Sequence, residues 1–158
     1  MKTRIVPCLW FDTQAEEAAR FYTSIFKNSR ITAVSHYAEN MPMPKGTVLT
    51  VRFELDGQEH LAMNGGPMFH FTEAISLMVE CKNQQEIDFY WDRLLDGGSE
   101  AQCGWLKDKY GLSWQVVPEG LEKLIGDEDP TKANRVLQAV MGMVKLDVAK
   151  LEAAHAGK

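Results

Sequence analysis

The sequence contains one pattern twice. Residues 8–28 (CLWFDTQAEEAARFYTSIFKN) and 76–96 (SLMVECKNQQEIDFYWDRLLD) each consist of an apolar run, an acidic break and an amphipathic helical segment. A hairpin signal that contains glycine follows each copy, at Asp56-Gly57 and at Tyr110-Gly111. A duplicated unit of strand, helix and further strands predicts a pseudo-symmetric α+β fold whose two sheets enclose a space.

In the first half, alternating apolar residues and turn signals predict strands around one helix. Thr13 and Glu16 have the spacing of a capping box, which places the start of the helix after Thr13. Asn28 is expected to end this helix, and residues 38–46 form a proline-containing loop. The expected strands are 4–11, 31–37, 47–55 and 59–63.

The second half repeats this order, and a third section follows it. Asn83 and Glu86 cap the expected helix, and Asp129-Pro130 is a favourable start for another. Apolar residues from Val136 to Leu151 form one stripe, which predicts a long terminal helix. This helix packs either on the domain's own sheet or on a second subunit. The expected strands are 75–79, 105–107 and 113–117.

Charge and cysteine content narrow the class of protein. A formal net charge of −5 argues against nucleic acid and anionic membranes as partners, because both attract basic surfaces. No apolar run approaches the roughly 20 residues of a membrane span, and the N-terminus lacks the apolar core of a signal peptide. Three cysteines without paired spacing do not indicate a disulfide framework. We therefore expect a cytoplasmic protein.

Three long segments carry a family resemblance. They are PCLWFDTQAEEAARFY, LDGQEHLAMNGGP and CGWLKDKYGLSWQVVP. These segments resemble the PhnB-like family, often labelled a 3-demethylubiquinone-9 3-methyltransferase domain. That family lies within the vicinal-oxygen-chelate superfamily of glyoxalase I, extradiol dioxygenases and the bleomycin and fosfomycin resistance proteins. The resemblance extends over nearly the whole chain, including the terminal helix.

The resemblance implies an architecture as well as a family. It implies paired βαβββ modules that form a curved eight-stranded mixed sheet with a central cleft, followed by a C-terminal helix. Residues 1–158 would form one domain, with modules at about 4–67 and 74–118 and a helical extension at about 119–155. Members of the superfamily are usually homodimers, so we expect a homodimer here.

The resemblance also locates the superfamily's metal site, where four inward side chains, normally His, Glu or Gln, hold a divalent ion. The equivalent positions here are Cys8, Leu61, Ser76 and Gln115. Leucine has no donor atom, and serine and glutamine are weak ligands without a stronger partner. We therefore expect no catalytic metal and no other cofactor.

The histidines and thiols offer no alternative centre. His60 follows Glu59 on one strand, so the two side chains point to opposite faces. His36, His70 and His155 are expected at the surface or in satisfied polar positions. Cys8 and Cys103 lack an assignable histidine to form a thiolate, which favours the role of small buried hydrophobes.

Aromatic and amide side chains indicate a binding site instead. Trp10 and Trp105 would supply apolar surface, and Asn64 and Gln115 would orient a small polar molecule. Aromatic residues on strands are also common core residues, so this interpretation competes with simple packing. The residues proposed to line the cleft are Cys8, Trp10, Leu61, Asn64, Ser76, Cys103, Trp105 and Gln115.

The sequence thus predicts a metal-independent protein that binds a small molecule. The alternative is an enzyme acting on a small oxygenated substrate in the same cleft: a divalent-metal lyase, a dioxygenase, or one that uses Cys8. A purely structural role is the third interpretation. Methyl transfer is not expected, because Gly65-Gly66 follows a hairpin strand and opens no helix, unlike the glycine loop of a Rossmann fold.

Overall fold

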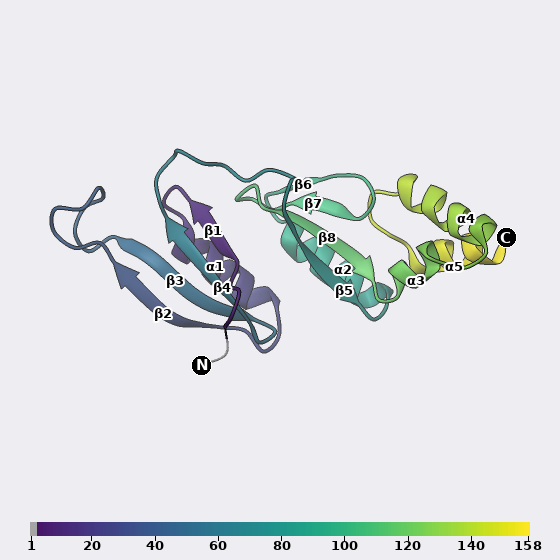
Figure 1. The fold of residues 1–158 in the computed structure, drawn as a ribbon, viewed down its shortest axis with the longest axis horizontal. Helices are drawn as coiled ribbons and strands as arrows, with labels where there is room; N and C mark the ends of the chain where they lie inside the picture. Colours follow the sequence, from purple (N-terminus) through teal and green to yellow (C-terminus); the bar gives the residue numbers. More distant parts are fainter. Residues whose placement is uncertain (1–2) are drawn as a thin grey trace. The chain divides into compact units, whose positions relative to one another are not determined.

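A computed structural model describes residues 3–158 and divides the chain into two compact units. The first unit ends at Phe71 and the second begins at Thr72 (Figure 1). Each unit contains a strand, a helix and three further strands in that order, which confirms the α+β fold of paired βαβββ modules. The eight strands form two four-stranded sheets, not one continuous sheet.

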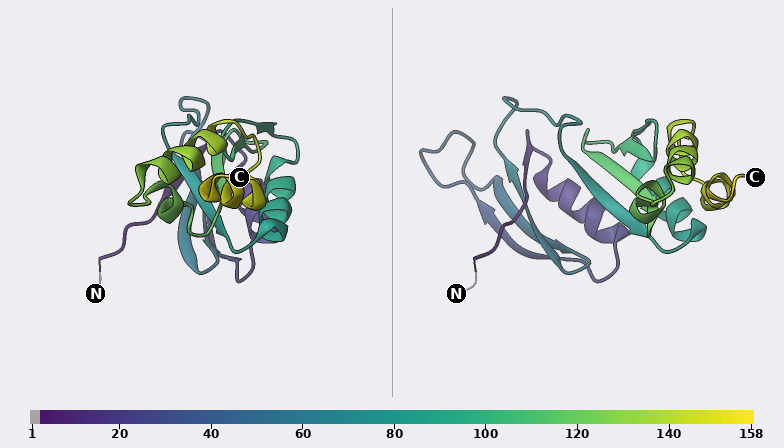
Figure 2. Two further views of the ribbon diagram at one scale, coloured as in Figure 1. Left: turned by 90° about the vertical axis from the view of Figure 1, so that its right-hand side faces the viewer. Right: turned by 45° about the vertical axis from the view of Figure 1, so that its right-hand side comes forward.

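The first unit is a mixed sheet with one helix. Strand β1 is parallel to β4, and the pairs β4–β3 and β3–β2 are antiparallel. Figures 1 and 2 show the helix α1 along one side of this sheet. The elements are β1 Cys8–Phe11, α1 Ala15–Ile25, β2 Arg30–His36, β3 Val48–Leu55 and β4 Gln58–Asn64.

Alternation along β3 and β4 separates the two faces of this sheet. Val51 and Phe53 are buried on the side that α1 covers, whereas Arg52 between them is exposed. The predicted hairpin at Asp56-Gly57 is confirmed, with φ angles of 45° and 81°. Both residues thus adopt the left-handed conformation of a tight two-residue turn.

The start of α1 differs from the prediction. Its N-cap is Gln14 and not Thr13, and within residues 3–158 the Gln14 side chain makes no capping hydrogen bond. Instead the Asn64 Oδ1 atom, at the end of β4, accepts a hydrogen bond of 2.8 Å from the Ala15 N–H. The cap therefore comes from a distant strand, which satisfies a helix N–H that would otherwise be buried without a partner.

The second unit has the same order of elements. The pair β5–β8 is parallel, while β8–β7 and β7–β6 are antiparallel. The predicted cap at Asn83 is confirmed, because its Oδ1 accepts a 3.0 Å bond from the Glu86 N–H. The elements are β5 Ser76–Cys81, α2 Gln84–Leu95, β6 Ser99–Glu100, β7 Trp105–Lys107 and β8 Ser113–Pro118.

A buried carboxylate organises the turn between β7 and β8. Asp108 Oδ1 accepts hydrogen bonds from the N–H groups of Tyr110 and Leu112, at 2.9 and 3.1 Å. Its Oδ2 accepts a 2.8 Å bond from the indole of Trp114. Three donors compensate the cost of burying the carboxylate, so Asp108 stabilises the turn.

The prediction of one long terminal helix is wrong. The section contains α3 Leu121–Ile125, α4 Pro130–Met141 and α5 Val148–Ala156. Gly142 ends α4, and Asp147 begins α5 by accepting a 3.0 Å bond from the Lys150 N–H. The break lets the apolar stripe fold onto itself, so the side chains form one cluster within the unit. Its members are Val117, Val136, Val140, Leu146 and Leu151.

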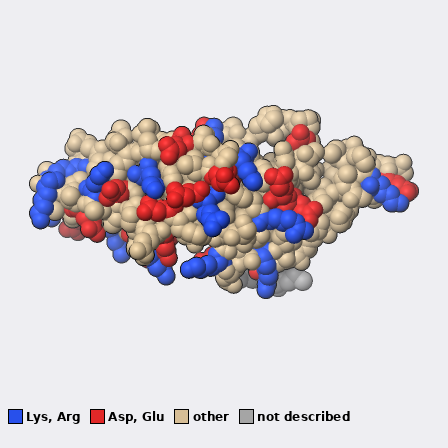
Figure 3. Space-filling model, turned by 180° about the vertical axis from the view of Figure 1, so that it is seen from behind, with Lys and Arg blue, Asp and Glu red and all other residues tan. Residues whose placement is uncertain are grey.

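Among the described residues, neither the surface charge nor the helices indicate a membrane or nucleic-acid partner. On the face seen in Figure 3, basic and acidic side chains are interspersed, without a continuous patch of one sign. Within residues 3–158, no helix has both the length and the apolar character that crossing a bilayer requires.

Candidate functional site

The four mapped metal positions lie on the sheet faces opposite α1 and α2, which we call the helix-free faces. Cys8 and Leu61 are register partners in the parallel pair β1–β4, so their side chains leave the same face. Ser76 and Gln115 share the corresponding face of the second sheet, where the Gln115 Nε2 donates a 2.9 Å hydrogen bond to the Ser76 Oγ. The sequence mapping therefore selected two neighbouring pairs, one in each unit.

The thiol of Cys8 is exposed, but it is not activated. Partial burial raises the pKa of the Cys8 thiol above its ordinary value. A catalytic thiol needs a lowered pKa, usually from a histidine or another cation nearby. The geometry thus favours a neutral Cys8 side chain at neutral pH.

Trp10 explains the two glycines that end β4. Its indole Nε1 donates a 2.9 Å bond to the Gly66 carbonyl, and its ring makes an edge contact with Phe69 at a centroid distance of 5.0 Å. A Cβ atom at Gly65 would lie 2.2 Å from the indole ring, so only glycine fits. Gly65 leaves room for the indole, and the two glycines open no helix, which is unlike a nucleotide-binding loop.

The second unit adds a polar group of three side chains. Ser113 is the register partner of Ser76, two residues before Gln115 along β8, so all three share one face. The Ser113 hydroxyl is buried and, among residues 3–158, has no hydrogen-bond partner. Trp105 is the register partner of Gln115 and is half-buried beside it. An amide, two hydroxyls and an indole therefore lie together on this face.

A cation lies at the edge of that group. Lys107 is the register partner of Ser113 across β7–β8. Its Nζ is 2.5 Å from the Glu73 Oε1. The hydrogen bond from Lys107 lowers the pKa of the exposed Glu73 carboxyl. Both side chains reach solvent, so the pair can open at little cost.

These donor atoms do not fit a divalent metal. The mapped positions supply a neutral thiol, an aliphatic side chain, a hydroxyl and an amide, and the amide N–H is already bonded to the hydroxyl. Divalent ions in proteins are held by imidazole, carboxylate or thiolate groups. Across the described part of the chain, no three His, Cys, Asp or Glu side chains gather as a metal site.

Two further residues predicted for the cleft, Asn64 and Cys103, have structural partners. Asn64 is 5% exposed on the side covered by α1, and its Nδ2 donates a 3.0 Å bond to the Val48 carbonyl, in addition to capping α1. Cys103 packs against the C-terminal apolar cluster, and its N–H donates to the Met143 carbonyl at 2.7 Å. Both residues have structural partners within their own unit.

The histidines have packing or surface roles. His60 is 4% exposed, stacks on Phe53 at a centroid distance of 5.3 Å, and bonds through Nδ1 to the Gln58 carbonyl. Burial lowers the pKa of His60, which favours its neutral form. His155 pairs with Asp127 at 2.7 Å, a partner that the sequence spacing did not reveal.

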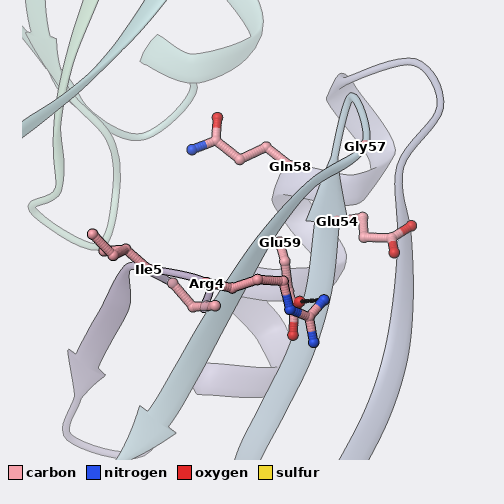
Figure 4. A pocket seen from close by; sticks show the side chains of 7 residues that line it. Arg4, Ile5, Glu54, Gly57, Gln58 and Glu59 are labelled. Atoms are coloured by element: carbon pink, nitrogen blue, oxygen red, sulfur yellow. Dashed lines mark hydrogen bonds and ion pairs between the residues drawn. The ribbon is translucent and has the colours of Figure 1, made fainter. Parts of the chain in front are cut away.

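A surface pocket of about 320 Å³ lies beside the hairpin of β3 and β4 (Figure 4). Glu59, two residues before Leu61 along β4, bonds to Arg4 at 2.7 Å and also to Arg52. The pocket therefore adjoins the helix-free face of the first sheet. The sequence does not reveal this pocket, because Arg4 and Glu59 lie 55 positions apart along the chain. Its lining comprises Arg4, Ile5, Val6, Glu54, Gly57, Gln58 and Glu59.

The paired βαβββ fold defines the class of the protein, and solved structures agree. A protein of Pseudomonas aeruginosa has a TM-score of 0.62 at 19% identity, covering 75% of this chain and 98% of that one. The fosfomycin resistance protein FosX of Listeria monocytogenes, in a monoclinic form, has a TM-score of 0.53 at 16% identity, covering 78% and 96%. At these identities the similarity concerns the fold alone.

The family is more specific. Residues 3–117 match the family described as 3-demethylubiquinone-9 3-methyltransferase, and the chain belongs to it. The PhnB protein of Bacillus cereus is 39% identical, with a TM-score of 0.68, over 73% of this chain and 99% of that one. A comparison with curated proteins finds no match.

The family match is shorter than the resemblance indicated. We expected it to include the terminal helix, but it ends at residue 117, before α3 begins at Leu121. The helices α3, α4 and α5 therefore lie outside the matched family region.

Proposed function

We propose that this protein binds a small organic molecule and does so without a catalytic metal. The observation that carries the proposal is the identity of the four mapped side chains, Cys8, Leu61, Ser76 and Gln115. Position by position, they replace the strong ligands of the superfamily with weak or apolar groups.

The surrounding side chains support binding over catalysis. Trp10 and Trp105 are both half-buried, so part of each indole is available for contact with a ligand. The Gln115 carbonyl oxygen can accept a hydrogen bond while its N–H remains on Ser76. Apolar surface with a few fixed polar groups is the usual composition of a small-molecule site.

The chain's own residues support neither catalysis by Cys8 nor methyl transfer. A thiol with a raised pKa is a poor nucleophile at neutral pH, which disfavours an enzyme that uses Cys8. Methyl transfer would need a glycine loop for the cofactor, whereas Gly65 leaves room for the Trp10 indole and the Gly66 carbonyl accepts a hydrogen bond from it. The family description therefore contributes no reaction step to the proposal.

We also propose a cytoplasmic homodimer. All three cysteines are free, and Cys8 is exposed, a state that a reducing compartment maintains. The usual dimer of the superfamily supports the second part of the proposal. Sedimentation equilibrium tests it, and a monomer at micromolar concentration would contradict it.

Metal analysis and native mass spectrometry test the central proposal. The protein is purified without chelator, and bound metal and co-purified small molecules are measured in the wild type, in Gln115→Ala and in Gln138→Ala. Gln138 is an exposed residue of α4, so it is the matched control. We expect substoichiometric metal in all three proteins and a bound small molecule whose occupancy falls only in Gln115→Ala.

One metal ion per chain that disappears in Gln115→Ala would overturn the metal-free proposal in favour of a metalloenzyme. Titration with Mn²⁺ and Zn²⁺ provides a second measurement. We expect no saturable binding that depends on Gln115.

A further inference from the structure

We propose that the C-terminal helices, which lie outside the matched family region, position the Trp105–Gln115 part of the site. This inference rests on the proposed function in one respect, namely that Trp105 and Gln115 bind a ligand. The contacts that position the two residues do not depend on that function. The helices contact the strand that carries Trp105 through the loop preceding it. They also reach the strand that carries Gln115 near its end. Every contact involved lies within the second unit.

The first contact is a pair of backbone hydrogen bonds. The N–H groups of Cys103 and Gly104 donate to the carbonyls of Met143 and Val144, at 2.7 and 2.8 Å. The Gly104 carbonyl in turn accepts a 2.8 Å bond from the Val116 N–H. Residues 103–104 are thus held between β8 on one side and the segment joining α4 to α5 on the other.

The loop is held in a conformation that needs external support. Cys103 has a φ of 65° and Gly104 a φ of 80°. A left-handed conformation at a residue other than glycine is unfavourable and persists only where the surroundings fix it. The Cys103 side chain is fixed by packing against the C-terminal cluster.

Gly104 also marks a close approach between the two parts. A Cβ atom there would lie 2.9 Å from the Val116 carbonyl oxygen and 3.0 Å from the Leu146 Cγ. Leu146 is fully buried, so it is a fixed contact and not a mobile surface side chain. Since Trp105 follows Gly104 directly, the position of Leu146 determines where β7 begins.

The second contact is at the end of β8. Val117 belongs to the C-terminal cluster and lies two residues beyond Gln115, so the two side chains share a face. The C-terminal helices therefore constrain Trp105 from its preceding loop and Gln115 from its following residues.

Side chains of α2 bind the segment that joins α4 to α5. The Gln84 Nε2 donates a 3.1 Å bond to the Leu146 carbonyl, and its Oε1 accepts a 2.9 Å bond from the Val148 N–H. Lys145 pairs with Asp88 at 2.8 Å. Removing the Gln84 amide loosens the segment without changing the site itself, which provides a selective test.

The test uses ¹⁹F NMR of protein labelled with 5-fluorotryptophan. The chain has four tryptophans, and each resonance is assigned by a single Trp→Phe variant. We expect Gln84→Ala to shift or broaden the Trp105 resonance and to leave that of Trp10 unchanged. Gln85→Ala is the matched control, because Gln85 is an exposed neighbour on the same helix.

A second variant, Leu146→Ala, and a second measurement, hydrogen exchange, test the same inference independently. Leu146→Ala removes the contact with Gly104 directly, and hydrogen exchange at Gly104 is expected to increase about tenfold in Gln84→Ala, as for the loss of one hydrogen bond. An unchanged Trp105 resonance in both variants, with faster exchange in α5, would overturn the inference. These measurements need no ligand, so they do not depend on whether the proposed function is correct.

Discussion

The helix-free faces of the two units differ in chemistry, although the two units have the same order of strands and helix. In the first unit the mapped positions hold Cys8 and Leu61, which offer apolar contact and a neutral thiol. In the second unit the equivalent positions hold Ser76 and Gln115, which form a hydrogen bond with each other. The repeated positions therefore point to equivalent faces in the two units, but their side chains are apolar or thiol in the first unit and polar in the second.

The two helix caps show a related difference. Asn64 caps α1 from a distant strand and is buried, whereas Asn83 caps α2 locally at an exposed position. This contrast yields the largest of the effects that we expect on stability.

Asn64→Ala should lower the free energy of unfolding by about 3 kcal/mol, because it leaves the Ala15 N–H and the Val48 carbonyl without their partners. Asn83→Ala should cost about 1 kcal/mol, since water replaces an exposed cap. Urea unfolding of both variants measures the difference. Equal losses would show that the distant cap contributes no more than the local one.

Sequence patterns predicted the parts of the fold that depend on near neighbours. The strand β7, the hairpin at Asp56-Gly57 and the cap at Asn83 each depend on residues a few positions apart. The cap at Asn64 acts across 49 positions, which no local pattern encodes.

The same reason explains the result at the terminal helices. The apolar stripe was visible in the sequence, but only packing of Val136 against Leu146 and Leu151 shows that the chain folds back. For the candidate site, the mapping identified the side chains that share a face. It did not reveal the contact of Trp10 with Gly65 or the burial of the Ser113 hydroxyl, which depend on three-dimensional packing.

The two units also differ in how a cysteine makes their stability depend on pH. Burial, with a smaller contribution from Glu86, raises the pKa of Cys81 to about 12. A raised pKa in the folded state means that stability is full below the unfolded pKa, near 8.5, and is lost as the pH rises toward 12. We expect the wild type to lose on the order of 1 kcal/mol between pH 8 and pH 10 from this group.

Cys81→Ala should reduce this alkaline loss, although it lowers stability overall by removing a buried side chain. Cys8→Ala is the control from the other unit and should leave most of the pH dependence intact, because Cys8 is exposed. Urea unfolding at pH 8 and pH 10 measures both. Parallel pH dependence in the wild type and Cys81→Ala would contradict the assignment.

The smallest effect concerns reactivity and not stability. A disulfide reagent such as DTNB should modify Cys8 first, at a rate that increases with pH because the raised pKa keeps the thiol protonated at pH 7. Cys8→Ser should remove this fast phase and change the unfolding free energy by less than about 0.5 kcal/mol. A fast phase that is already maximal at pH 7 would indicate an activated thiol and would revive the catalytic alternative.

The capping of α1 by Asn64 also has a consequence for the order of folding. The helix α2 can begin from its own neighbouring residues, because Asn83 is adjacent to it in the chain. The start of α1 is complete only when β4 has returned beside β1, so its stabilisation awaits the closure of a long loop. In kinetic terms, we expect helix formation in the second unit to precede the full ordering of the first, since local contacts form before distant ones.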